Sequence, residues 1–285
     1  MTSLVTGAGG FVGQHLVSHL RQRGDPVVGA GHGADVEVDF REPGSVRRLL
    51  ATHRPEVIFH LAGTTSLAEM RRDPGAGHGN IVRPVVILLD ELLQRHRATR
   101  LVLVSGWQAY GRPQRLPIAE DHPLAPIDIY GSARAATELV ARNYLAHKLD
   151  IVIARPFHHT GPGQTRASLV PGWIAQHLNG SAPIRTGNLD LRRDICDVRD
   201  VVEGYALLAS SGEAGQTYNL CSGKTVSLRA LFELACPGAT AISEPDVEAE
   251  LPVLWGDASK LEALGWIRRY AHAQTVADLR RSLST

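Results

Sequence analysis

A tyrosine and an arginine four residues apart, Tyr130 and Arg134, are residue types that together could move a proton. They begin the stretch Tyr130–His147, whose apolar spacing predicts a helix, and residues four apart lie on one helix face. A phenol exchanges protons poorly at neutral pH unless a nearby positive charge stabilises its phenolate form. The pair therefore predicts a general acid, Tyr130, beside a permanent cation, although a surface pair on a helix would have the same spacing.

Three equally spaced glycines, Gly7, Gly10 and Gly13, lie between an apolar run and a helical stretch at the start of the chain. Such a turn lets a pyrophosphate approach the backbone and accept hydrogen bonds from N–H groups of the following helix. The glycines alone are a weak signal, but a strand before them and a helix after them favour a dinucleotide site. We expect Phe11 and Val12, which open the helix, to belong to that site.

The end of the second predicted strand bears on which dinucleotide is bound. An NAD site has an acidic residue there for the ribose 2′-hydroxyl, but this chain has Gly31 followed by His32. His32 and the nearby Arg41 could instead partner a 2′-phosphate, so the sequence favours NADP(H) over NAD(H). A solvated loop residue is the competing interpretation of His32.

Short apolar runs and helical stretches alternate through the first half of the chain and must position these residues. The predicted strands are Ser3–Thr6, Pro26–Ala30, Val36–Val38, Val57–Leu61, Leu101–Ser105 and Ile151–Ala154. The predicted helices are Phe11–Arg23, Gly44–His53, Asn80–His96 and Tyr130–His147. This order predicts an α/β fold, a Rossmann-type doubly wound parallel sheet with its ligands at the carboxyl ends of the strands.

The alternation of apolar runs and helical stretches ends after Pro156, where glycine- and proline-rich loops surround a predicted helix at Ser168–Leu178. A strand and helix return at Asp197–Ala209, and shorter elements follow. We therefore expect a dinucleotide-binding domain of residues 1–155 plus about 196–221. A smaller, discontinuous C-terminal substrate domain would comprise about 156–195 and 222–285.

The composition narrows the class of protein. The 285 residues carry 30 basic and 29 acidic side chains, a net charge of +1, with no block of like charge. This balance argues against nucleic-acid and membrane-surface partners, and no apolar run approaches the roughly 20 residues that span a bilayer. Three cysteines without close pairing argue against disulfides and a zinc site, so we expect a cytoplasmic protein without a bound metal.

Four segments in the second half carry the most specific pattern. The segments are Ala154–Gln164, Gly187–Val201, Tyr218–Gly223 and Val253–Leu261. Together with the glycine spacing, they resemble the extended short-chain dehydrogenase/reductases, the NAD-dependent epimerase/dehydratase family, and are most similar to its GDP-4-keto-6-deoxy-mannose reductases. The similarity runs from Leu4 to about Trp266.

Three positions depart from the family pattern. Arg134 stands where the motif Tyr-x-x-x-Lys has lysine, Gly106 where a serine or threonine is usual, and His158 where asparagine is usual. Ser105, one residue earlier, could supply the missing hydroxyl or simply cap its strand. Trp107 and Gln108 follow where the dehydratase branch has an acid pair, so dehydration lacks its general acid and base.

The resemblance implies a role for each remaining site residue. Arg134 would hold the cofactor ribose, and Asp39 would accept from the adenine amino group. The implied catalytic residues are Tyr130, Arg134 and Ser105. The cofactor site would add Phe40, Leu61, Ala62, Gly63 and Pro156 to the glycine turn, His32 and Asp39. Substrate contacts would come from Asn80, Trp107, His158, Arg192 and Arg193. The guanidinium groups of the two arginines favour binding of a diphosphate, and surface charge is the competing interpretation.

The function expected from these residues is NADP(H)-dependent reduction of the 4-keto group of a nucleotide-diphospho-4-keto-6-deoxyhexose. The alternatives are a nucleotide-sugar 4-epimerase, or a catalytically weakened cofactor-binding protein, because Arg134 replaces lysine. The nucleobase and the sugar epimer stay open. The resemblance also implies a homodimer formed through Asn80–His96 and Tyr130–His147, although an apolar helix face fits a monomer core equally well.

Overall fold

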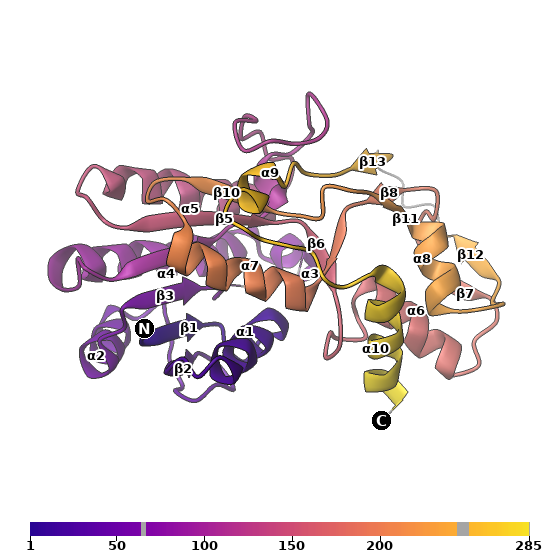
Figure 1. The fold of residues 1–285 in the computed structure, drawn as a ribbon, viewed down its shortest axis with the longest axis horizontal. Helices are drawn as coiled ribbons and strands as arrows, with labels where there is room; N and C mark the ends of the chain where they lie inside the picture. Colours follow the sequence, from indigo (N-terminus) through magenta and orange to yellow (C-terminus); the bar gives the residue numbers. More distant parts are fainter. Residues whose placement is uncertain (64–66, 244–250, 285) are drawn as a thin grey trace.

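A six-stranded parallel sheet forms the centre of the protein. The computed structural model describes residues 1–63, 67–243 and 251–284 (Figure 1). The sheet has the order β10-β5-β4-β3-β1-β2, and every neighbouring pair is parallel. Its strands are β1 (Ser3–Thr6), β2 (Val27–Ala30), β3 (Val57–His60), β4 (Arg100–Val104), β5 (Ile151–Pro156) and β10 (Thr217–Leu220). The predicted doubly wound parallel sheet is confirmed.

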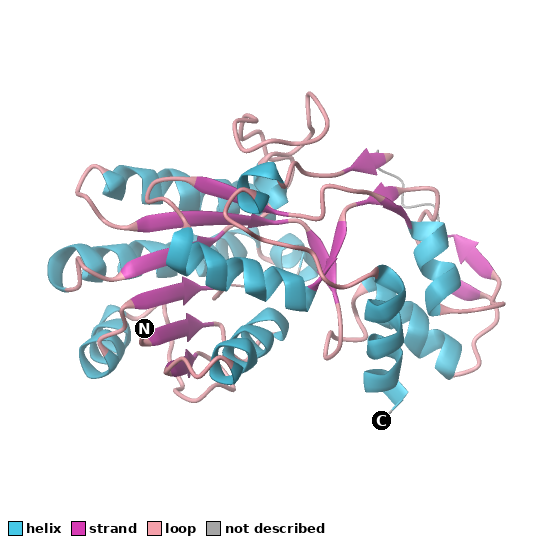
Figure 2. Cartoon of the chain, in the orientation of Figure 1, coloured by secondary structure: helices cyan, strands magenta, loops and turns pink. Residues whose placement is uncertain are grey.

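Helices cover both faces of this sheet (Figure 2). One core contains apolar residues of α1 and α7, and the other contains those of α2, α4 and α5. The helices of the sheet region are α1 (Phe11–Gln22), α2 (Pro43–His53), α3 (Leu67–Arg72), α4 (Pro74–Arg95), α5 (Ile129–Leu145) and α7 (Val198–Ser211). The two-sided burial explains why the strands are almost continuously apolar instead of alternating.

Two predicted elements differ from the structure. The run Val36–Val38 is not a strand, because only a single bridge joins Val36 to Ala30. Acidic side chains of this segment accept backbone hydrogen bonds, Asp35 from Gly29 and Glu37 from Gly33, and such local bonds compete with a ladder.

Helix α4 begins at Pro74, one and a half turns before the predicted start at Asn80. Asp73 caps it, since its Oδ1 accepts from the N–H of Ala76 at 3.0 Å, and Pro74 suits the first helical position. Glycines at 75, 77 and 79 have low helix propensity and give this segment no apolar periodicity, so the sequence pattern does not predict a helix there. Asn80 is therefore within the helix and does not cap it.

The second half of the chain builds a separate apolar core beyond the carboxyl ends of the strands (Figures 1 and 2). Its helices are α6 (Leu169–Leu178), α8 (Leu228–Ala235) and α10 (His272–Ser284). The short helix α9 (Ser259–Glu262) lies on the sheet instead, where its Leu261 belongs to the core of α1 and α7, and a 3-10 turn, η1 (Trp107–Ala109), follows β4. Short strand pairs join these pieces: β6 (His158–Thr160) with β9 (Ile195–Asp197), β7 (Ile184–Thr186) with β12 (Ala241–Ser243), and β8 (Arg192–Arg193) with both β11 (Val226–Ser227) and β13 (Val253–Leu254).

A buried ion pair fixes α5 against the sheet. The Arg155 guanidinium of β5 donates to both carboxylate oxygens of Glu138, at 2.9 and 2.6 Å, and neither side chain is more than 2 % exposed. The same guanidinium lies 4.4 Å from the centre of the Tyr110 ring. A buried charge persists only with such partners, so this pair sets the position of the helix that begins with Tyr130.

Within the described ranges, no helix is both long and apolar enough to cross a membrane.

Candidate active site

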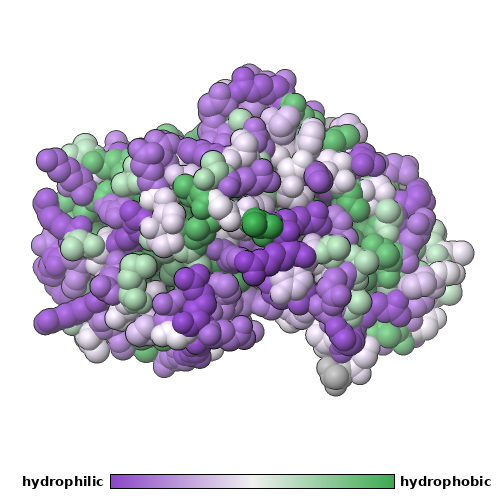
Figure 3. Space-filling model, in the orientation of Figure 1, coloured by the Kyte–Doolittle hydropathy of each residue, from purple (hydrophilic) through white to green (hydrophobic). Residues whose placement is uncertain are grey.

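A cavity of about 1090 Å³ lies where the strand order reverses, between the ends of β1 and β3. Figure 3 shows the surface hollowed between the sheet and the region of α6 and α10. This is where open α/β sheets bind their ligands. The predicted residues that line the cavity are Gly7, Gly10, Phe11, Val12, Gly13, His32, Asp39, Phe40, Leu61, Ala62, Gly63, Asn80, Ser105, Trp107, Tyr130, Pro156, His158 and Arg193. Arg134 and Arg192 are predicted residues outside its lining.

The glycine turn forms one wall of this cavity. Gly10 precedes α1 in an extended conformation and gives the helix no side-chain cap. The backbone N–H groups of the first helical turn are therefore available to a ligand. A Cβ on Gly13 would lie 2.2 Å from the Gly7 carbonyl oxygen, so this turn requires glycine. The Phe11 ring stacks on His159 of β6, with centroids 6.2 Å apart, and joins the turn to the opposite wall.

The structure brings Tyr130 and Arg134 together as predicted from their spacing. Nε of Arg134 donates to the phenol oxygen of Tyr130 at 3.1 Å, and Nη1 donates to the Val104 carbonyl at 3.0 Å. Tyr130 faces the cavity, whereas Arg134 is 4 % exposed and lies behind the phenol. The phenol oxygen therefore accepts from Arg134 and has its own proton available for a group in the cavity.

Ser105 lies at the end of β4 on the same wall. Its Oγ is buried and has no hydrogen-bond partner among the residues that the structure describes, and the residue lines the cavity. A buried hydroxyl without a partner is unfavourable in the free protein and is available to a ligand oxygen. A Cβ on Gly106 would approach only the flexible Gln108 side chain within 3 Å, so the backbone leaves room for the hydroxyl residue usual at that position.

His60, at the end of β3, is a buried residue that the sequence analysis missed. Its Nδ1 is 3.0 Å from Oγ1 of Thr6, and that oxygen also accepts from the N–H of Ala62. Burial, with a further contribution from Arg134, lowers the pKa of His60 to about 3. The neutral imidazole thus helps to hold the Leu61–Gly63 turn against the cavity.

The loop after β2 places the carboxylate of Glu37 near the end of that strand. The Glu37 carboxylate accepts from His32 Nδ1 at 3.0 Å and from the Gly33 N–H at 3.2 Å. Asp39 and Arg41 form a neighbouring pair, whose hydrogen bonds lower the pKa of Asp39 to about 2. Glu37 was not among the predicted residues, because the acid of an NAD site was expected at the strand end itself.

The wall opposite the glycine turn comes from the second half of the chain. The His158 ring packs against Trp107, with centroids 5.0 Å apart and planes tilted by 40°. Arg193 faces the cavity, and its Nη1 donates to the Leu251 carbonyl at 2.8 Å. The neighbouring Arg192 is exposed outside the cavity, where its Nε donates to Thr225. Adjacent strand residues point to opposite faces, and of the two predicted arginines only Arg193 lines the cavity.

Further cavity residues come from loops that carry no periodic pattern. They lie in the loop after β6, at the last residue of β7 and in the loop after β7, and they add hydroxyl and amide groups to this wall. These residues are Gln164, Thr165, Thr186, Gly187 and Asn188. Gln164, Gly187 and Asn188 lie in two of the segments that carry the family resemblance, but no individual role was predicted for them.

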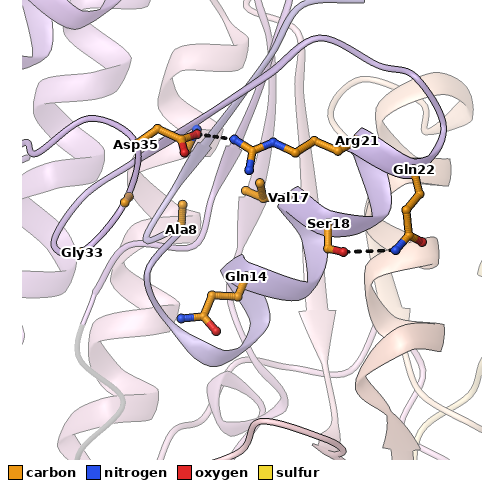
Figure 4. Close-up of a pocket in the computed structure, with 10 residues that line it drawn as sticks. Ala8, Gln14, Val17, Ser18, Arg21, Gln22, Gly33 and Asp35 are labelled. Carbon is orange, nitrogen blue, oxygen red and sulfur yellow. Dashed lines mark hydrogen bonds and ion pairs between the residues drawn. The ribbon is translucent and has the colours of Figure 1, made fainter.

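A second, smaller hollow lies between α1 and the loop after β2, and Figure 4 shows its lining. Its charged groups already satisfy one another: Asp35 accepts from Arg21 at 2.6 Å and from the Gly29 N–H at 2.8 Å. The Gly29 N–H and then Arg21 lower the pKa of Asp35. We therefore assign the chemistry to the larger cavity. In the described part of the chain, no three His, Cys, Asp or Glu residues cluster as metal ligands.

The sequence matches the NAD dependent epimerase/dehydratase family over residues 3–221. The chain belongs to this family, the extended branch of the short-chain dehydrogenase/reductases, and is an NAD(P)-dependent nucleotide-sugar oxidoreductase.

Among its relatives, GDP-6-deoxy-D-mannose reductase of Pseudomonas aeruginosa is 34% identical over 242 residues, 81% of this chain and 77% of the relative. UDP-glucose 4-epimerase of Mycolicibacterium smegmatis is 31% identical and covers 97% of this chain and 96% of the relative. A solved structure, RMD from Pseudomonas aeruginosa complexed with NADPH, has a TM-score of 0.90 at 29% identity, and covers 99% of each chain.

Proposed function

We propose that this protein reduces the 4-keto group of a nucleotide-diphospho-4-keto-6-deoxyhexose with NADP(H). The observation that carries the proposal is the convergence of the phenol of Tyr130 and the partnerless hydroxyl of Ser105 on the cavity that also holds the glycine turn. Trp107 and Gln108 stand where elimination would need carboxyl groups. The relative named GDP-6-deoxy-D-mannose reductase supports the same substrate class.

Tyr130, Ser105 and Arg134 each have a separate role in the proposed reaction. A bound nicotinamide cofactor supplies the hydride that adds to C4 of the sugar. Tyr130 donates its phenolic proton to the oxygen that becomes the alcohol, while Ser105 donates a hydrogen bond that orients this oxygen. Arg134, already bonded to the phenol oxygen, stabilises the phenolate that remains. Its Nη2 lies 3.8 Å from the position of a Cβ on Gly63, beside the expected ribose.

The proposed preference for NADP(H) rests on the donors at the end of β2. His32 Nδ1 and the Gly33 N–H already bind one oxyanion, the Glu37 carboxylate. The 2′-phosphate of NADPH carries more charge and more acceptor oxygens than that carboxylate, and would displace it from these donors. The complex of RMD with NADPH is consistent with this assignment.

We also propose that the substrate is held by a separate lobe, residues about 156–195 and 222–285, which closes on residues 1–155 plus about 196–221. The support is the second apolar core, which contains residues of α6, α8 and α10.

Kinetic assays with GDP- and dTDP-linked 4-keto-6-deoxyhexoses test the function. We expect NADPH oxidation and a 4-hydroxy sugar product, with a higher kcat/KM for NADPH than for NADH. A stable C4 epimer formed from a saturated UDP-hexose, without net cofactor oxidation, would support the epimerase instead. Cofactor binding with no turnover of any of these sugars would identify a weakened binding protein.

Arg193→Ala is expected to raise the KM for the nucleotide sugar by about tenfold to a hundredfold, because charge-assisted hydrogen bonds contribute about 1.5–3 kcal/mol. Arg192→Ala is the matched control, since Arg192 does not line the cavity. NADPH affinity should be unchanged in both proteins. Steady-state kinetics and cofactor titration measure these constants, and equal KM values for the two variants would remove Arg193 from the substrate site.

We propose a homodimer formed through α4 and α5. These helices pack side by side on the sheet, and Leu139 of α5 is 58% exposed. Leu139→Lys is therefore expected to shift the sedimenting species to monomer. Leu234→Lys on α8, where the leucine is 41% exposed, is the control that should leave the dimer intact. A monomeric wild-type protein in analytical ultracentrifugation contradicts this proposal.

A further inference from the structure

A histidine of α1 joins the glycine-turn side of the cavity to the opposite wall. His15 lies one turn after Phe11, the first residue of this helix, and the two rings meet edge to face with centroids 5.4 Å apart. Nε2 of His15 is 2.7 Å from the carbonyl oxygen of Pro162, a residue 147 positions away in the chain. Because a carbonyl oxygen can only accept, Nε2 carries the proton and donates this hydrogen bond.

Phe11 makes a second contact between α1 and the same part of the chain. Its ring lines the cavity and stacks on His159 of β6, with the two planes 14° apart. His159 is itself held in place, because its Nδ1 donates to the Phe157 carbonyl at 2.9 Å. Residues four apart share a helix face, so Phe11 and His15 present one face of α1 to β6 and to the loop after it.

The loop around Pro162, residues 161–165, depends on contacts from outside it. A Cβ on Gly161 would lie 2.7 Å from Cγ1 of Val198, so the loop begins pressed against α7. Gly163 is exposed and has a φ of +81°. Glycine loses more conformational freedom on ordering than any other residue. The order of the Pro162 loop therefore depends on contacts such as the bond from His15.

The Pro162 loop also positions two side chains of the cavity wall. Gln164 and Thr165 belong to this loop, and both line the cavity. The Thr160 hydroxyl donates to Oε1 of Gln164 at 2.6 Å, and the Gln164 N–H donates to the Gly161 carbonyl at 3.2 Å. These bonds connect the loop to the end of β6. A shift of Pro162 would therefore move the amide group of Gln164 within the cavity.

We propose that His15 is a positioning residue that couples cofactor binding to the order of the Pro162 loop, and so to nucleotide-sugar binding. The inference rests on the proposed function for placing the cofactor at the glycine turn and the nucleotide sugar at the opposite wall. A pyrophosphate bound to the first N–H groups of α1 restrains the helix face that carries Phe11 and His15. The loop bonded to this face then loses less conformational entropy when the nucleotide sugar binds, which makes the two ligands cooperative.

Hydrogen exchange of backbone amides tests the coupling with one added ligand, whichever of NADPH and NADH binds more tightly. In the wild-type protein, we expect the saturating cofactor to slow exchange in residues 161–165 by about fivefold or more. In His15→Ala, the cofactor should bind with near wild-type affinity, because His15 does not line the cavity, but should slow this exchange by less than about twofold. His15→Gln should recover part of the effect, since its side-chain amide can donate to Pro162.

Gln22→Ala is the matched control on the same helix. The Gln22 side chain is exposed near the end of α1, where its amide donates to Ser18 (Figure 4). It lies almost three turns from Phe11, so its loss should leave the Pro162 loop unaffected. We expect the cofactor to slow exchange in residues 161–165 of this variant as much as in the wild type.

Cofactor titration gives an independent measure of the coupling. Linkage requires that a nucleotide whose binding is strengthened by the cofactor strengthens cofactor binding by the same factor. The probes are GDP, dTDP and UDP, and at least one should lower the Kd of the cofactor about fivefold or more in the wild type. His15→Ala should remove this effect without changing the affinity for the cofactor alone.

Three results would overturn the proposal. Equal slowing of exchange by the cofactor in the wild type and His15→Ala would show that the cofactor orders the loop by another route. Faster exchange in His15→Ala, by the same factor with and without cofactor, would assign His15 a structural role alone. A cofactor affinity that none of the three nucleotides changes in the wild type would exclude coupling between the two sites.

The outcome is distinguishable from that of the proposed function. Both measurements are made without turnover, so coupling through His15 stands if no 4-keto sugar is reduced. Reduction of 4-keto sugars by a protein whose Pro162 loop responds to the cofactor without His15 would retain the function and reject the inference.

Discussion

Tyr130→Phe is expected to lower the rate of 4-keto reduction by about a hundredfold or more, the size of effect typical of losing a positioned general acid. The phenol is the cavity group that accepts from Arg134 and still has a proton to donate. The substitution removes one oxygen and leaves the ring, so the packing of α5 should persist. NADPH should therefore bind with nearly its wild-type affinity, as measured by fluorescence titration alongside the reductase rate.

Tyr144→Phe is the matched control on the same helix. Its hydroxyl donates to Asp90 at the protein surface, far along α5 from the cavity. This variant should keep the wild-type rate. An unchanged rate in Tyr130→Phe would reject the tyrosine mechanism. His158 would then be a poor replacement as acid, since burial lowers the pKa of its imidazole to about 3 and leaves the ring neutral at physiological pH.

The parts of the site that depend on local spacing could be predicted from the sequence. The glycine turn needs only one strand, one turn and one helix, and a Cβ at Gly13 has no space. Likewise, residues 130 and 134 share a face in any α-helix. The parallel sheet follows from the alternation of apolar runs with helices, since parallel strands need crossover connections.

The parts that depend on distant or unpatterned segments could not be predicted in this way. His60 meets Thr6 from a strand 54 residues away. Glu37 lies in a loop whose path no periodicity describes. The two arginines of β8 are a different case, because the alternation of side chains along a strand already prevents both from facing one cavity. The prediction that both arginines bind one diphosphate took account of their charge and not of this alternation.

Arg134→Met is expected to reduce the reductase rate by about a hundredfold or more, because it removes the donor to the phenol oxygen and the charge that stabilises the phenolate. It also leaves the Val104 carbonyl without its guanidinium donor. Arg134→Lys restores a cation at the position where the family has lysine, and should retain or raise the wild-type rate. Single-turnover rates with saturating NADPH measure both effects.

The guanidinium of Arg134 is permanently charged, so it cannot pass a proton as an ammonium group can. Its contribution must then come from holding the phenol and the phenolate, and this contribution disappears with the charge. Arg142→Met, two turns further along α5 and partly exposed, controls for the general effect of removing an arginine from this helix. Thermal unfolding of all three variants would show whether the buried substitution has unfolded the site. A folded Arg134→Met protein with the wild-type rate would mean that arginine at this position reflects only the chain's preference for arginine, which supplies 27 of its 30 basic residues.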